Sequence, residues 1–135
     1  MKPENVLVDR DGYIKITDFG LSKENITSGN MAQSLCGTAE YLSPEIISRT
    51  GHGKASDWWS FGALICEMLI GSPPFYSQDR ERLYRNIKNS EPKLNYSFLS
   101  PNAKDIITKL LTKNPDHRLG SGENGVEHIK AHPWF

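Results

Sequence analysis

Two short β-rich runs open the chain and predict a hairpin. Residues 5–9, NVLVD, and residues 13–17, YIKIT, are rich in β-branched side chains. The pair Asp11 and Gly12 lies between them and is typical of a tight turn. Residues 22–33 are mostly polar and include Gly29, which indicates a loop.

The hydrophobic period changes from Ser56 onward and predicts a central helix. Residues 56–70 are apolar on nearly all sides, so we expect a buried helix rather than a surface one. Ser56 is the predicted N-cap, and Gly71 is the predicted C′ residue.

Further helices are predicted after the central one. Residues 77–89 form a polar amphipathic pattern with Leu83 and Ile87 four positions apart. Residues 100–112 begin with Ser100 as a cap and a proline at the first helical position. A glycine-rich turn then leads to a last short helix and the C-terminal HPWF. The outline is a small hairpin followed by a mainly helical body.

Composition limits the classes of function and compartment. The 16 basic and 16 acidic residues give a net charge of zero, so no overall field favours nucleic acid or an anionic membrane. Cys36 and Cys66 make no disulfide framework, which fits a reducing compartment, and Cys66 lies in an apolar run typical of a core residue. No apolar signal-peptide segment is present near the N-terminus. The longest apolar run, residues 58–70, is too short to span a bilayer.

Three polar side chains lie where the predicted hairpin joins the rest of the chain. Asn5 begins the first strand and Asp18 follows the second, so a hairpin would bring their side chains together. Amide and carboxylate oxygens are hard ligands that suit Mg²⁺ bound to phosphate. Lys2 is close enough in sequence to reach the same phosphate as a point charge. Taken singly, each is more often a turn or capping residue, so the interpretation depends on their joint occurrence.

Short motifs in a fixed order carry a family resemblance. Residues 2–5 read KPEN, residues 18–20 read DFG and residues 43–45 read SPE. Their order and spacing resemble eukaryotic protein kinases, in which the catalytic loop is followed by D-F-G and then A-P-E. The segments CGTAEYLSPE, SDWWSFGALICEMLIGSPPF and RLGSGENGVEHIKAHPWF are similar to the AGC group of serine/threonine kinases, which includes the cAMP-dependent kinase and the protein kinase B type. The resemblance covers residues 1–135 and implies the α+β protein-kinase fold, with this chain as its mainly helical C-lobe.

The resemblance implies phosphoryl transfer to serine or threonine of protein substrates, with ATP and Mg²⁺ as cofactors. By this analogy Asn5 and Asp18 hold the metal on ATP, and Lys2 steadies the transferring phosphate. Leu7 would lie under the adenine ring, and an apolar column would continue from it into the central helix. The column comprises Val6, Val8, Leu64 and Met68.

The resemblance also implies roles for residues around the activation segment. Ser34 occupies the position of the activation-loop phosphosite of an upstream kinase, although without the family context it is an ordinary loop serine. Thr38 occupies the position whose hydroxyl contacts the catalytic Asp and Lys, and it implies Ser/Thr rather than Tyr specificity. Asp57 is expected to bind the catalytic-loop backbone from the central helix.

Charged residues complete the implied site. Glu4, Glu40 and Glu67 occupy positions that contact substrate arginines in basophilic relatives, so we expect substrates with basic residues near the phosphorylated Ser or Thr. Glu4 and Glu67 could equally be solvated or capping residues. Glu45 and Arg118 match a pair that joins the activation segment to the helical body, and such a pair is costly to break from one side.

Some features depart from the family pattern. Ala39 stands where proline is common, and Ser43 replaces the alanine of A-P-E. The H-R-D triplet, which holds the catalytic base, would end just before Met1, and the Gly-rich loop, the strand lysine and its partner glutamate are missing. We therefore expect residues 1–135 to be a partial kinase domain that is inactive alone and, with apolar surface uncovered on the central helix, prone to aggregation. The side chains concerned are Trp58, Trp59 and Leu64.

The sequence leaves competing functions. The first is the C-lobe of an ATP-dependent, basophilic serine/threonine kinase. The second is a catalytically dead lobe that keeps the peptide groove and acts as a binding or decoy module. The third, a non-kinase helical domain with chance motifs, is disfavoured by the ordered matches. We expect a protein of the cytoplasm, with the nucleus as a second compartment, that has no nucleic-acid partner and no transmembrane segment.

Overall fold

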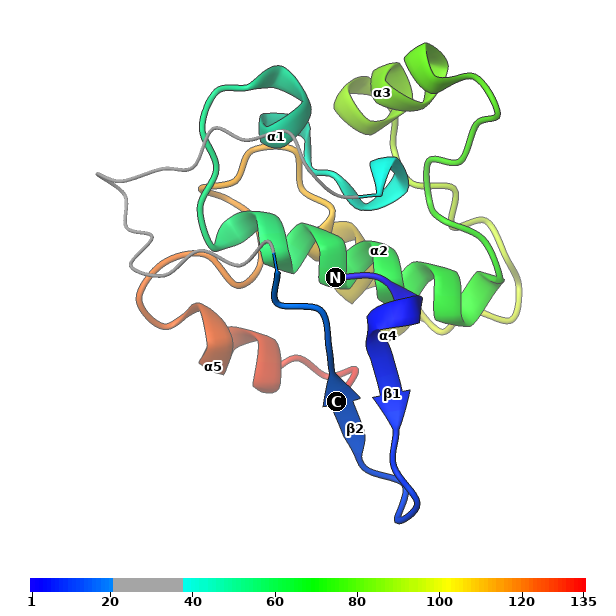
Figure 1. The fold of residues 1–135 in the computed structure, drawn as a ribbon, viewed down its shortest axis with the longest axis vertical. Helices are drawn as coiled ribbons and strands as arrows, with labels where there is room; N and C mark the ends of the chain where they lie inside the picture. The colour runs from blue at the N-terminus through cyan, green and yellow to red at the C-terminus, as the bar shows by residue number, and fades with distance from the viewer. Residues whose placement is uncertain (21–37) are drawn as a thin grey trace.

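The computed structural model describes residues 1–20 and 38–135 as a short hairpin followed by a body of helices. In chain order the elements are η1 (Pro3–Asn5), β1 (Val6–Val8), β2 (Ile14–Ile16), η2 (Ala39–Tyr41), α1 (Pro44–Ser48), α2 (Ala55–Ile70), α3 (Arg80–Asn89), α4 (Pro101–Leu110) and α5 (Gly125–Lys130). Figure 1 shows α2 crossing the middle of the molecule, with α1 and α3 above it in the view and the hairpin projecting below. The predicted hairpin and mainly helical body are confirmed. Within the described ranges, no helix is both long and apolar enough to cross a membrane.

The hairpin is an antiparallel pair in which Val6 lies opposite Ile16. The Asp9 carboxylate accepts hydrogen bonds from the backbone N–H groups of Asp11 and Tyr13, at 3.0 and 2.8 Å, and so closes the turn. Most side chains of both strands are exposed, because the hairpin projects away from the helices. Its function in the fold is therefore to place the start of β1 beside the end of β2.

The two ends of α2 differ in how well they follow the predicted caps. The helix begins at Ala55, and Ser56 is not its N-cap. The Ser56 hydroxyl instead donates a hydrogen bond to Glu45 at 2.7 Å, so a tertiary contact replaces the predicted local one. At the other end Gly71 adopts the left-handed conformation, with φ of 85°, and its N–H bonds the Glu67 carbonyl oxygen as a C-cap.

The starts of α3 and α4 follow from local capping chemistry. The Asp79 carboxylate accepts a hydrogen bond from the Arg82 N–H at 2.6 Å, so α3 begins after Asp79 and is shorter than the predicted 77–89. Ser100 caps α4 as predicted, because its hydroxyl accepts from the Ala103 N–H at 3.1 Å.

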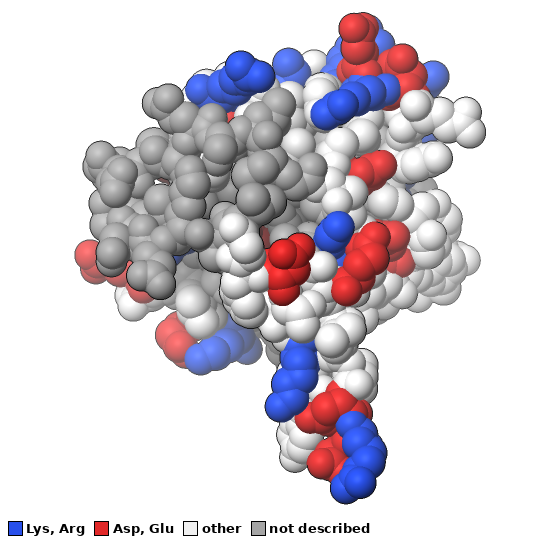
Figure 2. Space-filling view, in the orientation of Figure 1, with Lys and Arg blue, Asp and Glu red and all other residues white. Residues whose placement is uncertain are grey.

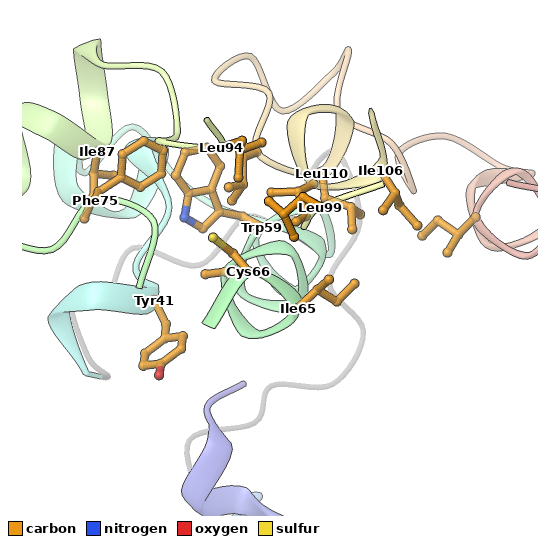
Figure 3. Close-up of a cluster of buried hydrophobic side chains, with 14 of the residues drawn as sticks. Tyr41, Trp59, Ile65, Cys66, Phe75, Ile87, Leu94, Leu99, Ile106 and Leu110 are labelled. Carbon is orange, nitrogen blue, oxygen red and sulfur yellow. The ribbon is translucent and has the colours of Figure 1, made fainter. Parts of the chain in front are cut away.

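The core forms where α2 packs against α4 and against the chain that folds back after α2. Trp59 is fully buried and stacks on Phe75, with ring centroids 5.6 Å apart (Figure 3). Cys66 is buried as predicted, and burial raises the pKa of its thiol to about 12. The expected exposure of α2 is wrong for Trp59 and Leu64, which are 0% and 4% exposed, while Trp58 is partly buried. Further core side chains are Leu83, Ile87, Ile106, Ile107 and Leu110.

Gly62 lies where α2 approaches α4 most tightly. A Cβ atom on Gly62 would lie 2.7 Å from Leu110 Cβ and 3.3 Å from the Leu111 side chain. Because Leu110 Cβ is fixed to the backbone, we expect Gly62→Ala to lower the free energy of unfolding by about 1–3 kcal/mol. The higher helix propensity of alanine, about 1 kcal/mol, offsets only part of the strain.

Urea denaturation checks this expectation. Met68→Ala serves as the control, since Met68 is on the same helix but 71% exposed. A Gly62→Ala chain as stable as the parent would contradict the tight packing of α2 on α4.

Candidate active site

The hairpin brings the two predicted metal ligands together. Asn5 ends η1 directly before β1, and Asp18 follows β2. The Asn5 amide nitrogen donates a hydrogen bond to Asp18 Oδ2 at 3.4 Å. Thr17 fixes this arrangement, because its backbone N–H and its hydroxyl both donate to the Asn5 carbonyl oxygen, at 2.9 and 3.3 Å. The two side chains are therefore neighbours, and their role as ligands stays a prediction.

The chemistry of this pair fits a metal that is shared with a phosphate. Asp18 has φ of 63°, an uncommon value for a residue with a Cβ atom, and its side chain is exposed. Lys2 is half-buried just before η1. In residues 1–20 and 38–135, no group of three or more His, Cys, Asp or Glu side chains could hold a metal by itself. One amide and one carboxylate oxygen suit Mg²⁺ that takes its remaining ligands from phosphate and water.

Three glutamates, Glu4, Glu40 and Glu67, form an acidic group near Tyr41 at the end of η2. The Tyr41 hydroxyl donates a hydrogen bond to the Glu67 carboxylate. Burial raises the pKa of Tyr41, and the negative charges of Glu67, Glu4 and Glu40 raise it further. Three glutamates from η1, η2 and α2 therefore act on one place, and Figure 2 shows acidic side chains gathered on this face. Local sequence gives no signal for Tyr41, since its partner comes from a distant helix.

The predicted apolar column is only partly present. Leu64 is buried and Val6 is half-buried, but Val8 and Met68 are 68% and 71% exposed. The interpretation of Val8 and Met68 as core residues is wrong. Val8 lies on the hairpin, which projects away from the helical body, and Met68 lies on the exposed side of α2. Leu7 is 52% exposed on β1, so its side chain is accessible to a ligand.

The remaining predicted residues have separate environments. Thr38 precedes η2, and its carbonyl oxygen accepts a hydrogen bond from the Tyr41 N–H at 3.1 Å. Asp57 is exposed in the first turn of α2. Burial lowers the pKa of the Met1 amino group and the charge of Asp57 opposes that change, so Asp57 faces the start of the chain. Ser34, the predicted phosphosite, lies outside the described residues, as does the predicted loop that contains it.

Arg118 and Glu45 form a buried, bidentate ion pair. The guanidinium Nη1 and Nη2 atoms donate to Glu45 Oε1 and Oε2 at 2.7 and 2.9 Å. The two side chains are 0% and 6% exposed. Arg118 also donates to the carbonyl oxygens of Thr112, Ala55 and Lys113, so all of its N–H groups have partners. The pair joins α1 to the start of α2 and to the segment after α4.

The environment of Glu45 keeps its carboxylate ionised. Burial alone would raise the pKa of Glu45, but the hydrogen bonds and charge of Arg118 outweigh burial and lower it. The Ser56 hydroxyl adds a further hydrogen bond at 2.7 Å. Ser56, expected as a helix cap, is therefore a member of this buried network.

Comparison with known families accounts for the order of these elements. The family described as protein kinase domain matches the chain over residues 1–135. The chain belongs to the protein kinase domain family. This membership confirms the resemblance carried by KPEN, DFG and SPE, and with it the fold class.

Relatives of this kinase chain match it along its whole length. Human ribosomal protein S6 kinase alpha-2 is 50% identical over 135 residues, and human ribosomal protein S6 kinase alpha-3 is 48% identical. The cAMP-dependent protein kinase type 3 of Saccharomyces cerevisiae is 47% identical over 135 residues. These similarities confirm the predicted likeness to the AGC group. The chain spans 18% of the length of each S6 kinase and 33% of the yeast kinase.

Proposed function

We propose that residues 1–135 form the C-lobe of a serine/threonine protein kinase domain, from the catalytic loop to the last helix. The gene product that carries this lobe transfers the γ-phosphate of ATP to Ser or Thr of protein substrates. The observation that supports this proposal most is the Asn5–Asp18 pair, which the hairpin holds at 3.4 Å. Membership of the protein kinase domain family supports the same class of reaction.

Each residue near the hairpin has a part in this proposal. Mg²⁺, when bound with ATP, offsets the negative charge of the phosphates. Asn5 and Asp18 would hold the metal through side-chain oxygens, and Lys2 would place a point charge on the transferring phosphate. Leu7, exposed on β1, would pack under the adenine ring. Thr38 orients the catalytic groups from the start of η2.

The reaction also needs a proton acceptor. The substrate hydroxyl oxygen bonds to the γ-phosphorus as the bond to the bridging oxygen breaks, ADP leaves and the hydroxyl proton passes to a carboxylate base. The family base belongs to an H-R-D motif, and residues 1–135 contain no such sequence. We therefore expect the 135-residue lobe alone to be inactive.

Membership of the kinase family also suggests how the protein is regulated and where it works. We propose Ser34 as the site of an upstream kinase, because an added phosphate supplies a strong negative charge for ordering an activation segment. We propose that the protein works inside the cell, where ATP and the activating kinase are present.

The acidic group around Tyr41 supports a proposal about substrate preference. The charges of three carboxylates act on the Tyr41 hydroxyl, namely those of Glu4, Glu40 and Glu67. This hydroxyl donates its hydrogen bond to Glu67. The other carboxylates can accept charge-assisted hydrogen bonds from guanidinium groups. We propose that substrates carry arginine or lysine near the phosphorylated residue.

Glu4→Gln tests the proposed function and its preference together. In the gene product that carries this lobe, we expect KM for an arginine-containing Ser peptide to rise about tenfold with little change in kcat, because a charge-assisted contact is lost. KM for the same peptide with glutamine in place of arginine should not change. Glu123→Gln, at an exposed position before α5, is the control.

The outcomes of this assay separate two failures. Equal effects on both peptides would contradict the preference for basic substrates while leaving the kinase activity in place. Absence of phosphate transfer to any Ser or Thr peptide by the gene product would contradict the proposed function.

A further inference from the structure

A groove lies on the far end of α2 from the Glu45–Arg118 pair. Its volume is about 370 Å³, and it runs between Cys66 and Ile70 of α2, one side of α3 and the segment that follows α3. Arg82 from α3 and Lys93 from the following segment both line it. Hydroxyl groups and aromatic rings complete the lining, including Tyr76 and Tyr96.

Positive charge in this groove has no partner within the described parts of the chain. Arg82 and Lys93 are both exposed, and neither takes part in an ion pair with a residue of ranges 1–20 and 38–135. Glu91 also lines the groove and offsets one of these two positive charges, and it opposes the effect of burial on the pKa of the neighbouring Lys113. The groove therefore keeps an excess of positive charge.

The rest of α3 adds to the positive charge near the groove. The helix carries Arg80, Arg82, Arg85 and Lys88 against a single acidic residue, Glu81. All five are exposed. Since the chain as a whole is neutral, this concentration of basic side chains on one helix is a local feature.

We propose that this groove docks an acidic segment of a protein partner. A guanidinium group binds carboxylates in a bidentate manner, and a lysine adds a point charge that tolerates several geometries. Tyr76 and Tyr96 are 56% and 38% exposed, so their rings can cover an apolar part of the segment while their hydroxyls reach its polar groups. Arg82 and Lys93 are the anchors of the acidic side chains.

The docking groove is separate from the proposed substrate site. Glu67 points to Tyr41 and belongs to the acidic group, whereas Cys66 and Ile70 of the same helix line the groove. An acidic segment is repelled by the acidic group around Tyr41 and attracted by the docking groove. Docking does not depend on the proposed kinase activity, and a binding experiment tests it alone.

The experiment uses the 135-residue chain and a short fluorescein-labelled peptide rich in Glu and Asp. Fluorescence anisotropy gives its affinity, and a matched peptide with Gln and Asn is compared. We expect the chain to prefer the acidic peptide and Arg82→Glu/Lys93→Glu to weaken it about tenfold or more. The control pair Arg10→Glu/Lys130→Glu makes the same change in net charge outside the groove and should alter affinity by less than about twofold.

The uncharged pair Arg82→Gln/Lys93→Gln guards against misfolding. It should also weaken binding, and circular dichroism should show unchanged helix content. Equal losses in groove and control variants would overturn the proposal, because binding would then follow net charge alone. Tighter binding of a single-stranded oligonucleotide than of the acidic peptide would also overturn it, as would equal affinity for the acidic and amide peptides.

Discussion

Arg118→Ala is expected to lower the free energy of unfolding of the chain by about 3–5 kcal/mol. Among residues 1–20 and 38–135, the substitution leaves the buried Glu45 carboxylate with the Ser56 hydroxyl as its remaining side-chain donor. It also removes the donors to the carbonyl oxygens of Thr112, Ala55 and Lys113. Because domains are stable by only about 5–15 kcal/mol, this loss is a large part of the total. Urea denaturation followed by circular dichroism measures it.

Two further variants show whether the geometry or the charge is responsible. Arg118→Lys keeps the charge but cannot make the bidentate contact with Glu45, so it should also be clearly destabilised. Arg85→Ala removes an exposed arginine of α3 and should change stability by less than about 0.5 kcal/mol. Equal stability of the Arg118→Ala and Arg85→Ala chains would contradict a stabilising role for the pair.

The same pair gives an acid dependence with a defined sign. The pKa of Glu45 is lowered in the folded chain from an ordinary value of 4.5. Its contribution to stability is therefore complete above about pH 4.5 and is lost as the pH falls through the folded pKa. The difference in stability between the parent and Glu45→Gln should be constant at neutral pH and should shrink in acid.

Asp18→Asn is expected to lower kcat/KM of the gene product at least about 100-fold, because phosphoryl transfer depends on positioning and charge. The amide keeps the size of the side chain but loses the charge that a metal ligand needs. Since Asp18 is exposed, the stability of the protein should hardly change. A steady-state assay with an arginine-containing Ser peptide measures the effect.

Asp11→Asn is the matched control for this change. Asp11 is an exposed aspartate in the turn of the same hairpin, at the end away from Asn5. It should retain the parent rate. A similar fall in both variants would show that the hairpin needs negative charge in general, and it would contradict a specific role for Asp18.

Sequence patterns predicted the structural features that depend on residues close together in the chain. The turn at Asp11 and Gly12, the C-cap at Gly71 and the N-cap at Ser100 each follow from local backbone chemistry. The proximity of Asn5 and Asp18 follows as well, because an antiparallel hairpin fixes which ends meet.

Contacts between distant segments could not be predicted in this way. Ser56 is a residue type that favours the N-cap position, but its hydroxyl donates a hydrogen bond to Glu45 instead. Trp59 is buried because Phe75 folds back onto it, and a hydrophobic pattern does not show which residue will cover another. Val8 and Met68 are apolar yet exposed, Val8 on the projecting hairpin and Met68 on the exposed side of α2. The carbonyl groups that accept hydrogen bonds from Arg118 also could not be predicted from the sequence, because every residue has a main-chain carbonyl group.

The claim that Asn5 and Asp18 form a site for metal and nucleotide is tested most directly by paramagnetic broadening. Mn²⁺, a substitute for Mg²⁺, is added with ATP to the ¹⁵N-labelled chain, and the backbone amide resonances are followed. We expect the resonances of residues around Asn5 and Asp18 to broaden first, and Asp18→Asn but not Asp11→Asn to abolish this selectivity. Broadening that begins at other acidic residues, or that is unchanged in Asp18→Asn, would contradict the site.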